Sequence, residues 1–204
     1  MRTYNLLFIL LLLSSAALGQ AAKYVVIPQS NSALDSARVM KITKVKEPCA
    51  FLSQGEKEVV QWLNIARMYP RWYLYFRKIK NTEPVYTQTL IRTLMAMQPI
   101  QKKLIPNKKL YEMAVCHAST AGALGYLGHD RQDPKCKKGM NAECIHYGGG
   151  KGAYKVERLL IDKGVPSLGH RTAMLNPQYR LVGVSIMPFN KPTHTEMVVI
   201  DFGF

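Results

Sequence analysis

The sequence lacks the short motifs that mark several enzyme and nucleotide-binding classes. It contains no His-Glu-x-x-His segment and no Gly-x-Ser-x-Gly turn, which argues against a standard zinc peptidase and against a hydrolase with a serine on such a turn. The glycines at 148–152 lack the Gly-Lys-Ser/Thr ending of a phosphate-binding loop, and Gly122, Gly125 and Gly128 do not have the spacing of a dinucleotide fingerprint. We therefore expect no nucleotide cofactor.

Acidic residues are scarce. The 204 residues include 13 Asp and Glu against 28 Lys and Arg, for a formal net charge of +15. A field of that sign attracts nucleic acid, anionic lipid or acidic glycan, and it keeps a protein soluble. No recognisable nucleic-acid module accompanies the charge, so we interpret it as a solvated basic surface and expect no specific nucleic-acid partner.

The apolar run at 6–13 follows Arg2 and precedes Ala17-Leu18-Gly19. A positive start, a short apolar block and small residues at the cleavage positions predict a secretory signal peptide over residues 1–19. The run is too short for a permanent membrane span, and no cysteine follows it to carry a lipid anchor. We expect an exported monomer, extracellular or periplasmic, with no integral membrane segment after signal removal.

The chain has four cysteines, at positions 49, 116, 136 and 144, and no Cys-x-x-Cys pair. In an exported protein disulfides are the default, with three possible connectivities for four cysteines. Cys136 and Cys144 bracket a short polar segment and are the easier pair to close, which leaves Cys49 with Cys116. A four-thiolate zinc site is the alternative, although the spacing does not support it.

Hydrophobic periodicity predicts one mixed domain over residues 49–204, preceded by an N-terminal extension over 20–48 with a short strand at 24–27. A Ser53–Glu56 capping box begins the first helix, which Pro70 ends. Three more helices are expected at 87–100, 108–124 and 153–163, and the glycine-rich stretch between the last two is expected to be loop. Strands at 182–186 and 197–202 form an antiparallel pair. Helices first and strands last indicate an α+β fold.

Several segments, taken in order, resemble a known family. They are Leu63-Asn64-Ile65-Ala66-Arg67, Leu110-x3-Ala114-x2-His117-Ala118, Gly128-His129, Glu143-x-Ile145-x-Tyr147-Gly148, residues 159–171 ending in Gly169-His170-Arg171, Leu175-Asn176-Pro177, Val182-Gly183-Val184 and Asp201-Phe202-Gly203. This order over most of the chain is similar to the CAP superfamily of cysteine-rich secretory proteins, antigen 5 and pathogenesis-related 1 proteins, in its bacterial short form. The resemblance implies a three-layer α-β-α sandwich with a small antiparallel central sheet.

The resemblance also implies a central cleft lined by histidines and acidic residues. By motif position these are His117, Glu143 and His170, with His129 at the rim. Asp162 stands nearest the position where many animal members carry a second glutamate. Cys144 departs from the asparagine that commonly follows the first glutamate. The remaining histidines, His146 and His194, match no motif and are expected at the surface.

Two imidazoles and a carboxylate suit a divalent metal, most readily Zn²⁺, and leave a position open for water or a ligand. We therefore expect a metal site formed by His117 and His170 with Glu143, and we leave open a metal-free His-Glu-His cluster that only orders the cleft. The resemblance favours a binding module for an extracellular or envelope lipid, glycan or peptide. The alternative is a secreted metal-dependent hydrolase of the peptidase or esterase type.

Overall fold

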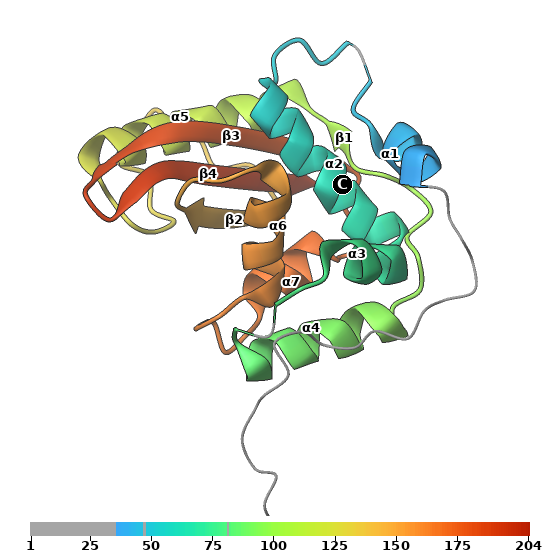
Figure 1. The fold of residues 1–204 in the computed structure, drawn as a ribbon. Helices are drawn as coiled ribbons and strands as arrows, with labels where there is room; N and C mark the ends of the chain where they lie inside the picture. The colour runs from blue at the N-terminus through green and yellow to red at the C-terminus, as the bar shows by residue number, and fades with distance from the viewer. Residues whose placement is uncertain (1–35, 47, 81) are drawn as a thin grey trace, which may run out of the picture.

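The computed structural model describes residues 36–46, 48–80 and 82–204 (Figure 1). The predicted signal peptide and the strand predicted at 24–27 lie outside these residues. The elements in chain order are α1 (Ser36–Thr43), α2 (Gln54–Met68), α3 (Pro70–Arg77), α4 (Pro84–Ala96), β1 (Ile105–Pro106), α5 (Lys108–Leu124), β2 (Ala142–Tyr147), α6 (Gly152–Ile161), α7 (Gly169–Met174), β3 (Leu181–Lys191) and β4 (His194–Gly203). No helix within the described ranges is long and apolar enough to span a membrane.

The strands form one four-stranded sheet in the order β1-β3-β4-β2. β3 pairs with β4, and β4 with β2, in antiparallel register, with Glu143 opposite Asp201. The two-residue strand β1 runs parallel to the start of β3. The α+β expectation is confirmed, but the sheet is mixed rather than wholly antiparallel because the chain before α5 pairs along the outer edge of β3.

Helices cover both faces of this sheet, so the domain has three layers (Figure 1). On one face α5 lies along β3 and β4, and its alanines at 114, 118 and 121 form a small core with Ile145 and Val199. The opposite face packs against α2, α6 and α7 in a larger core that includes Cys144, Val184 and Ile200. Because alternate residues of a strand face opposite sides, neighbours along β2 enter different cores.

The capping box predicted at Ser53 and Glu56 is present. The amide of Ser53 donates to Glu56 Oε2 at 2.7 Å, and the amide of Glu56 donates to Ser53 Oγ at 3.3 Å. The other carboxylate oxygen of Glu56 accepts from the amide of Ile186 at 3.0 Å, which joins the start of α2 to β3. Pro70 does more than end the pattern: it is the first residue of α3, a position where its missing amide proton costs no hydrogen bond.

Five elements fall where the sequence indicated no helix or strand, namely α1, α3, β1, β2 and α7, and two of them change the interpretation. Helix α1 lies inside the 20–48 extension, and it packs on α2 through the fully buried Val39 and a 2.9 Å hydrogen bond from Gln61 to the Met40 carbonyl. Strand β2 lies in the stretch expected to be loop. Its sequence, Ala-Glu-Cys-Ile-His-Tyr, is covered on both faces, so it lacks the regular polar face by which a half-buried strand is recognised.

Gly183 sets the distance between α5 and the sheet. A side-chain carbon at this position would lie 2.2 Å from the Leu110 carbonyl carbon and 2.3 Å from the Tyr111 amide nitrogen. Both are backbone atoms at the start of α5, so no rotation of a side chain can relieve the clash. The absence of a side chain here allows the helix to pack directly against β3.

We predict that Gly183→Ala lowers the free energy of unfolding by more than about 3 kcal/mol, because the helix must move away from the sheet. Urea unfolding followed by circular dichroism measures the change. Gly55→Ala is the matched control, since its added carbon would lie 3.5 Å from Ile186 Cδ1, an ordinary contact. The control should be neutral or slightly stabilising, and equal losses in both variants would contradict this account of Gly183.

Candidate functional site

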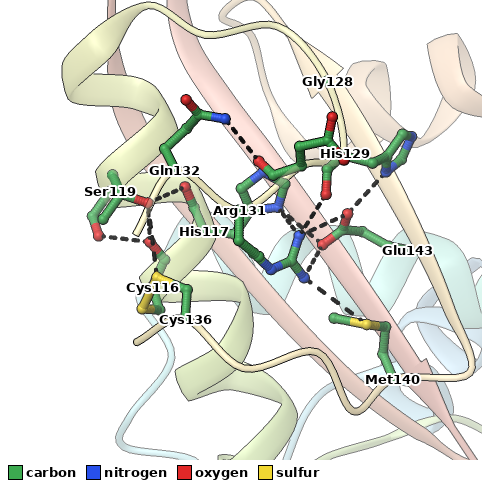
Figure 2. A network of polar contacts seen from close by, with 12 residues as sticks. Cys116, His117, Ser119, Gly128, His129, Arg131, Gln132, Cys136, Met140 and Glu143 are labelled. Carbon is green, nitrogen blue, oxygen red and sulfur yellow. Dashed lines mark hydrogen bonds and ion pairs between the residues drawn. A yellow bond between two sulfur atoms is a disulfide. The ribbon is translucent and has the colours of Figure 1, made fainter. Parts of the chain in front are cut away.

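Glu143 is the centre of a polar cluster between β2 and α5 (Figure 2). Its side chain is only 8 % exposed and points to the α5 face of the sheet, where His117 on α5 is fully buried. Glu143 Oε2 lies 3.0 Å from His117 Nδ1, and Oε1 lies 2.8 Å from Nδ1 of His129, in the loop after α5. The structure thus brings together three of the residues expected in the cleft.

Arg131, which the sequence did not single out, holds this cluster together (Figure 2). Its guanidinium is bidentate on Glu143, with Nη2 at 2.7 Å from Oε2 and Nη1 at 3.1 Å from Oε1. Nη1 also donates to the carbonyl of His129 and makes a short contact with His117 Nδ1. The side chain is 6 % exposed, so Arg131 and Glu143 form a nearly buried ion pair.

The contact with Arg131 decides the tautomer of His117. A guanidinium nitrogen can only donate, so Nδ1 of His117 accepts from Arg131 and the ring proton lies on Nε2. In this tautomer Nδ1 cannot donate to Glu143, although the two atoms are close. Nε2 is buried and has no hydrogen-bond partner among the described residues. Neither nitrogen of His117 is therefore exposed to an incoming ligand.

The surroundings of Glu143 keep it ionised. Burial alone would raise the pKa of this carboxyl, but hydrogen bonds from His129 and Arg131 outweigh burial and hold the pKa well below its usual range. A carboxylate that is this stable as an anion does not accept a proton near neutral pH. Glu143 is thus suited to orient neighbouring side chains and unsuited to act as a general base.

Asp201 lies beside Glu143 on the neighbouring strand, opposite it in register, and is fully buried. Neither of its carboxyl oxygens has a hydrogen-bond partner in the described part of the chain. Burial, followed by the negative charge of Glu143, raises the pKa of Asp201 to about 8. Asp201 is therefore mostly protonated at neutral pH.

His170 and Asp162 form a second histidine–carboxylate pair on the opposite side of β2. His170 Nδ1 lies 2.6 Å from Asp162 Oδ1, and the amides of His170 and Arg171 donate to Oδ2 at 3.0 and 3.2 Å. Asp162 ends α6 in the left-handed conformation, with φ of 59°, and its side chain is fully buried. The side-chain hydrogen bond of His170 goes to Asp162, so its Nε2 points away from the carboxylate.

Cys144 lies between the two pairs. Its Sγ donates weakly to the backbone carbonyl of His170 at 3.7 Å. Burial, followed by the charges of Asp162, Glu143 and Asp201, raises the pKa of the Cys144 thiol well above its usual range. A buried thiol that stays protonated is a poor nucleophile.

The predicted disulfide pairing was wrong. Cys116 on α5 is bonded to Cys136, with an S–S distance of 2.02 Å and a Cα–Cα distance of 5.4 Å. Cys136 lies against α5, whereas Cys144 faces α6 and α7 across the sheet, so the two cannot meet. Cys49 is buried in another part of the domain and is not bonded to Cys116. The actual bond fastens the loop that carries His129 and Arg131 to α5.

The other two histidines are half-buried rather than exposed. His146 packs edge-on against Tyr154 of α6, and its Nε2 is enclosed without a hydrogen-bond partner among the described residues. Burial, followed by the charges of Lys155 and Arg158, lowers the pKa of His146 to about 4. His194 stacks on Tyr147.

The residues expected to form one metal site are divided between two places. His117, His129 and Glu143 lie on the α5 face of the sheet, and His170 with Asp162 lies by α6 and α7. Within residues 36–46, 48–80 and 82–204, no group of three or more His, Cys, Asp or Glu side chains is arranged to hold a metal ion. The zinc site therefore stays a prediction.

The chain matches no family model and no curated protein. Among solved structures, it is similar to an outer surface protein from Borrelia burgdorferi, with 19 % identity and a TM-score of 0.38. The match covers 61 % of this chain and 95 % of that one.

We predict that Arg131→Met lowers the free energy of unfolding by about 3–5 kcal/mol, because Glu143 is left buried without its cation. Chemical denaturation measures the loss. Lys135→Met removes the same charge from an exposed position in the same loop and should cost less than about 0.5 kcal/mol. The double variant Arg131→Met/Glu143→Gln should recover part of the loss, and its failure to do so would argue against the ion pair as the cause.

We predict that Asp201→Asn stabilises the protein, increasingly so from pH 4 to pH 8. The folded-state pKa of Asp201 is raised to about 8, so the unfolded chain ionises first and the wild type loses stability over this range. The difference in free energy of unfolding between the variant and the wild type should grow by about 1.4 kcal/mol per pH unit. At pH 7 the variant should be more stable by roughly 2–4 kcal/mol. Urea unfolding at several pH values measures it. Glu112→Gln, at an exposed position on α5, should give no such slope.

Proposed function

We propose that this chain is an exported CAP-type binding domain that performs no catalysis and presents two oriented histidines, His129 and His170, to an extracellular or envelope ligand. The disulfide between Cys116 and Cys136 supports an oxidising compartment. The ligand classes in question are lipid, glycan and peptide, as the sequence leads us to expect. A divalent metal, Zn²⁺ first, is the further candidate for the histidines.

The engagement of both carboxylates by neighbouring donors is the observation that carries this proposal. Glu143 accepts from Arg131 through both oxygens and contacts two histidines, while Asp162 accepts from two amides and one imidazole. Carboxylates that each accept three hydrogen bonds serve to fix their partners in place. A hydrolase that used one of these carboxylates as its general base would need that carboxylate to take up a proton in each cycle.

The donor set supports weak metal binding at two separate histidines. A histidine that binds a metal through one ring nitrogen usually donates a hydrogen bond to a carboxylate through the other. Both His129 and His170 make such a hydrogen bond through Nδ1. His129 is 55 % exposed at the side chain and His170 is 22 % exposed, so their Nε2 atoms are the candidate ligands. His117 fits a metal poorly because Arg131 occupies its Nδ1. A bound metal would add a Lewis acid with open positions for a ligand.

The pairing of Asp162 with His170 also favours a second function, hydrolysis, because a carboxylate that orients a histidine is one half of a nucleophile-activating triad. The hydrolase alternative lacks a suitable nucleophile beside His170 among the described residues. Cys144 is the thiol beside this pair, and it is fully buried and bonded to the backbone of His170 rather than to its ring.

We predict that zinc titration by calorimetry gives weak binding at pH 7.5 at two separate places, so that His129→Ala and His170→Ala each remove part of the heat, the double variant removes it, and His117→Gln retains it. Imidazoles bind metals in the neutral form, so the heat should fall as the solution is made more acidic. His194→Ala is the matched control, since this ring lies outside both pairs. Identical heats in the wild type and in both alanine variants would exclude these histidines as ligands.

Turnover on a panel of esters and peptides separates the two functions. We expect no turnover above the solvent rate for the wild type, with or without added zinc. Turnover that disappears in His170→Ala and in Asp162→Asn would replace the binding proposal by the hydrolase.

A further inference from the structure

A groove lies away from the histidine pairs, between the segment after α4 and the segment after α7. Its volume is about 490 Å³, within the usual range for small-ligand sites. Met97, Pro99, Ile100 and Leu175 form much of its wall, and Lys102 and Arg180 are the charged residues that line it. An apolar trough lined by two cations and by no carboxylate of the described residues is suited to a ligand that is itself both apolar and anionic.

The chain around the groove contains no acid that could neutralise these cations. Residues 84–111 include five Lys and Arg and no Asp or Glu, and residues 163–195 include four Lys and Arg and no Asp or Glu. Lys102 is exposed and Arg180 is half-buried. The hydrogen bonds of Arg180 go to the carbonyls of Pro177 and Tyr179, so its charge has no counter-ion among the residues that the structure describes.

A third cation lies behind the wall. Arg67 is fully buried, and its guanidinium donates to the carbonyls of Met174, Asn176 and Tyr179, in the segment that carries Leu175 and Arg180. It forms no ion pair with any acid that the structure describes. Burial, followed by the nearby charge of Arg180, lowers the pKa of Arg67 to about 10. A buried charge without a partner is costly, and an anion in the groove would lower that cost.

We propose that this groove binds a medium-chain aliphatic acid, with the carboxylate between Lys102 and Arg180 and the chain against Met97, Ile100 and Leu175. The proposal rests on the proposed function only in that the chain is a binding domain, because it concerns a different site. Apolar walls favour such an acid over a nucleic-acid phosphate, which offers no aliphatic chain.

Calorimetry with octanoate, decanoate and dodecanoate below their micelle concentrations tests the ligand class. Affinity should rise about fourfold for each methylene that the groove covers. Decanol and decyltrimethylammonium have the same chain without the anion and should bind at least about tenfold more weakly. Monodecyl phosphate distinguishes the head groups: tighter binding than decanoate would replace the carboxylate by a phosphate and overturn the choice of acid. Equal affinity for decanol and decanoate would overturn the proposal.

Two variants locate the site. Lys102→Met removes an exposed charge from the groove, and it should weaken decanoate binding about three- to fivefold. Lys109→Met makes the same charge change on α5, outside the groove, and should have no effect. Met97→Asp places a negative charge on the wall and should weaken binding more than about tenfold. Circular dichroism and the urea midpoint show whether each variant is folded.

Equal effects of Lys102→Met and Lys109→Met would mean that the net charge, rather than the groove, attracts the acid, and this would overturn the proposal. His129→Ala and His170→Ala should bind decanoate as the wild type does. Loss of decanoate binding in those variants would place the acid at the histidines. Absence of decanoate binding together with normal zinc heats would remove the groove site and leave the proposed function intact.

Discussion

The ion pair between Arg131 and Glu143 is the interaction on which the site depends. It joins the loop after α5 to β2, and through His117 it joins both to α5. The Cys116–Cys136 disulfide fastens the same loop at a second point. Without the pair, His129 would lose the carboxylate that orients it. A buried ion pair of this kind adds little net stability, but each partner makes the other tolerable in the interior.

The charge balance on the α5 face of the sheet explains why Glu143 is ionised and Asp201 keeps its proton. One guanidinium neutralises one carboxylate, and Glu143 takes that cation through both oxygens. Asp201, adjacent and without a hydrogen bond from a described residue, remains neutral by keeping its proton. The two acids therefore differ because of their neighbours rather than because of their chemistry, and their opposite pKa shifts arise from a single pattern of contacts.

The sequence was most informative where a local rule acts alone. The capping box at Ser53 and the apolar stripe of α5 depend on neighbours three and four residues away, and both are observed. Strand β2 could not be found this way, since it is covered on both faces and flanked by glycines. Missing β2 also led to the wrong disulfide: as part of a loop, Cys144 could approach Cys136, but as part of a strand it faces the other side of the sheet.

The sequence predicted which residues take part in the site, but it did not predict which of them lie together. The motif positions found His129, Glu143, Asp162 and His170, and each of these makes a histidine–carboxylate contact. Their pairing depends on which side of β2 each residue approaches. Arg131 carried no signal, because in a chain with 28 basic residues one more arginine in a basic loop resembles a solvated charge.

The structure shows how the few acidic side chains are used. Many of the described acids are engaged within the protein, as in the pairs Arg77–Glu157, Lys155–Glu196 and Lys163–Glu83 and in the two histidine–carboxylate pairs. Few carboxylates are left to balance the remaining cations, and none lies in the two segments that line the groove. The surplus positive charge is thus a local property of surfaces such as this one. Because attraction over more than about 8 Å is screened at physiological ionic strength, the placement of Lys102 and Arg180 matters more for a bound anion than the net charge of the whole chain.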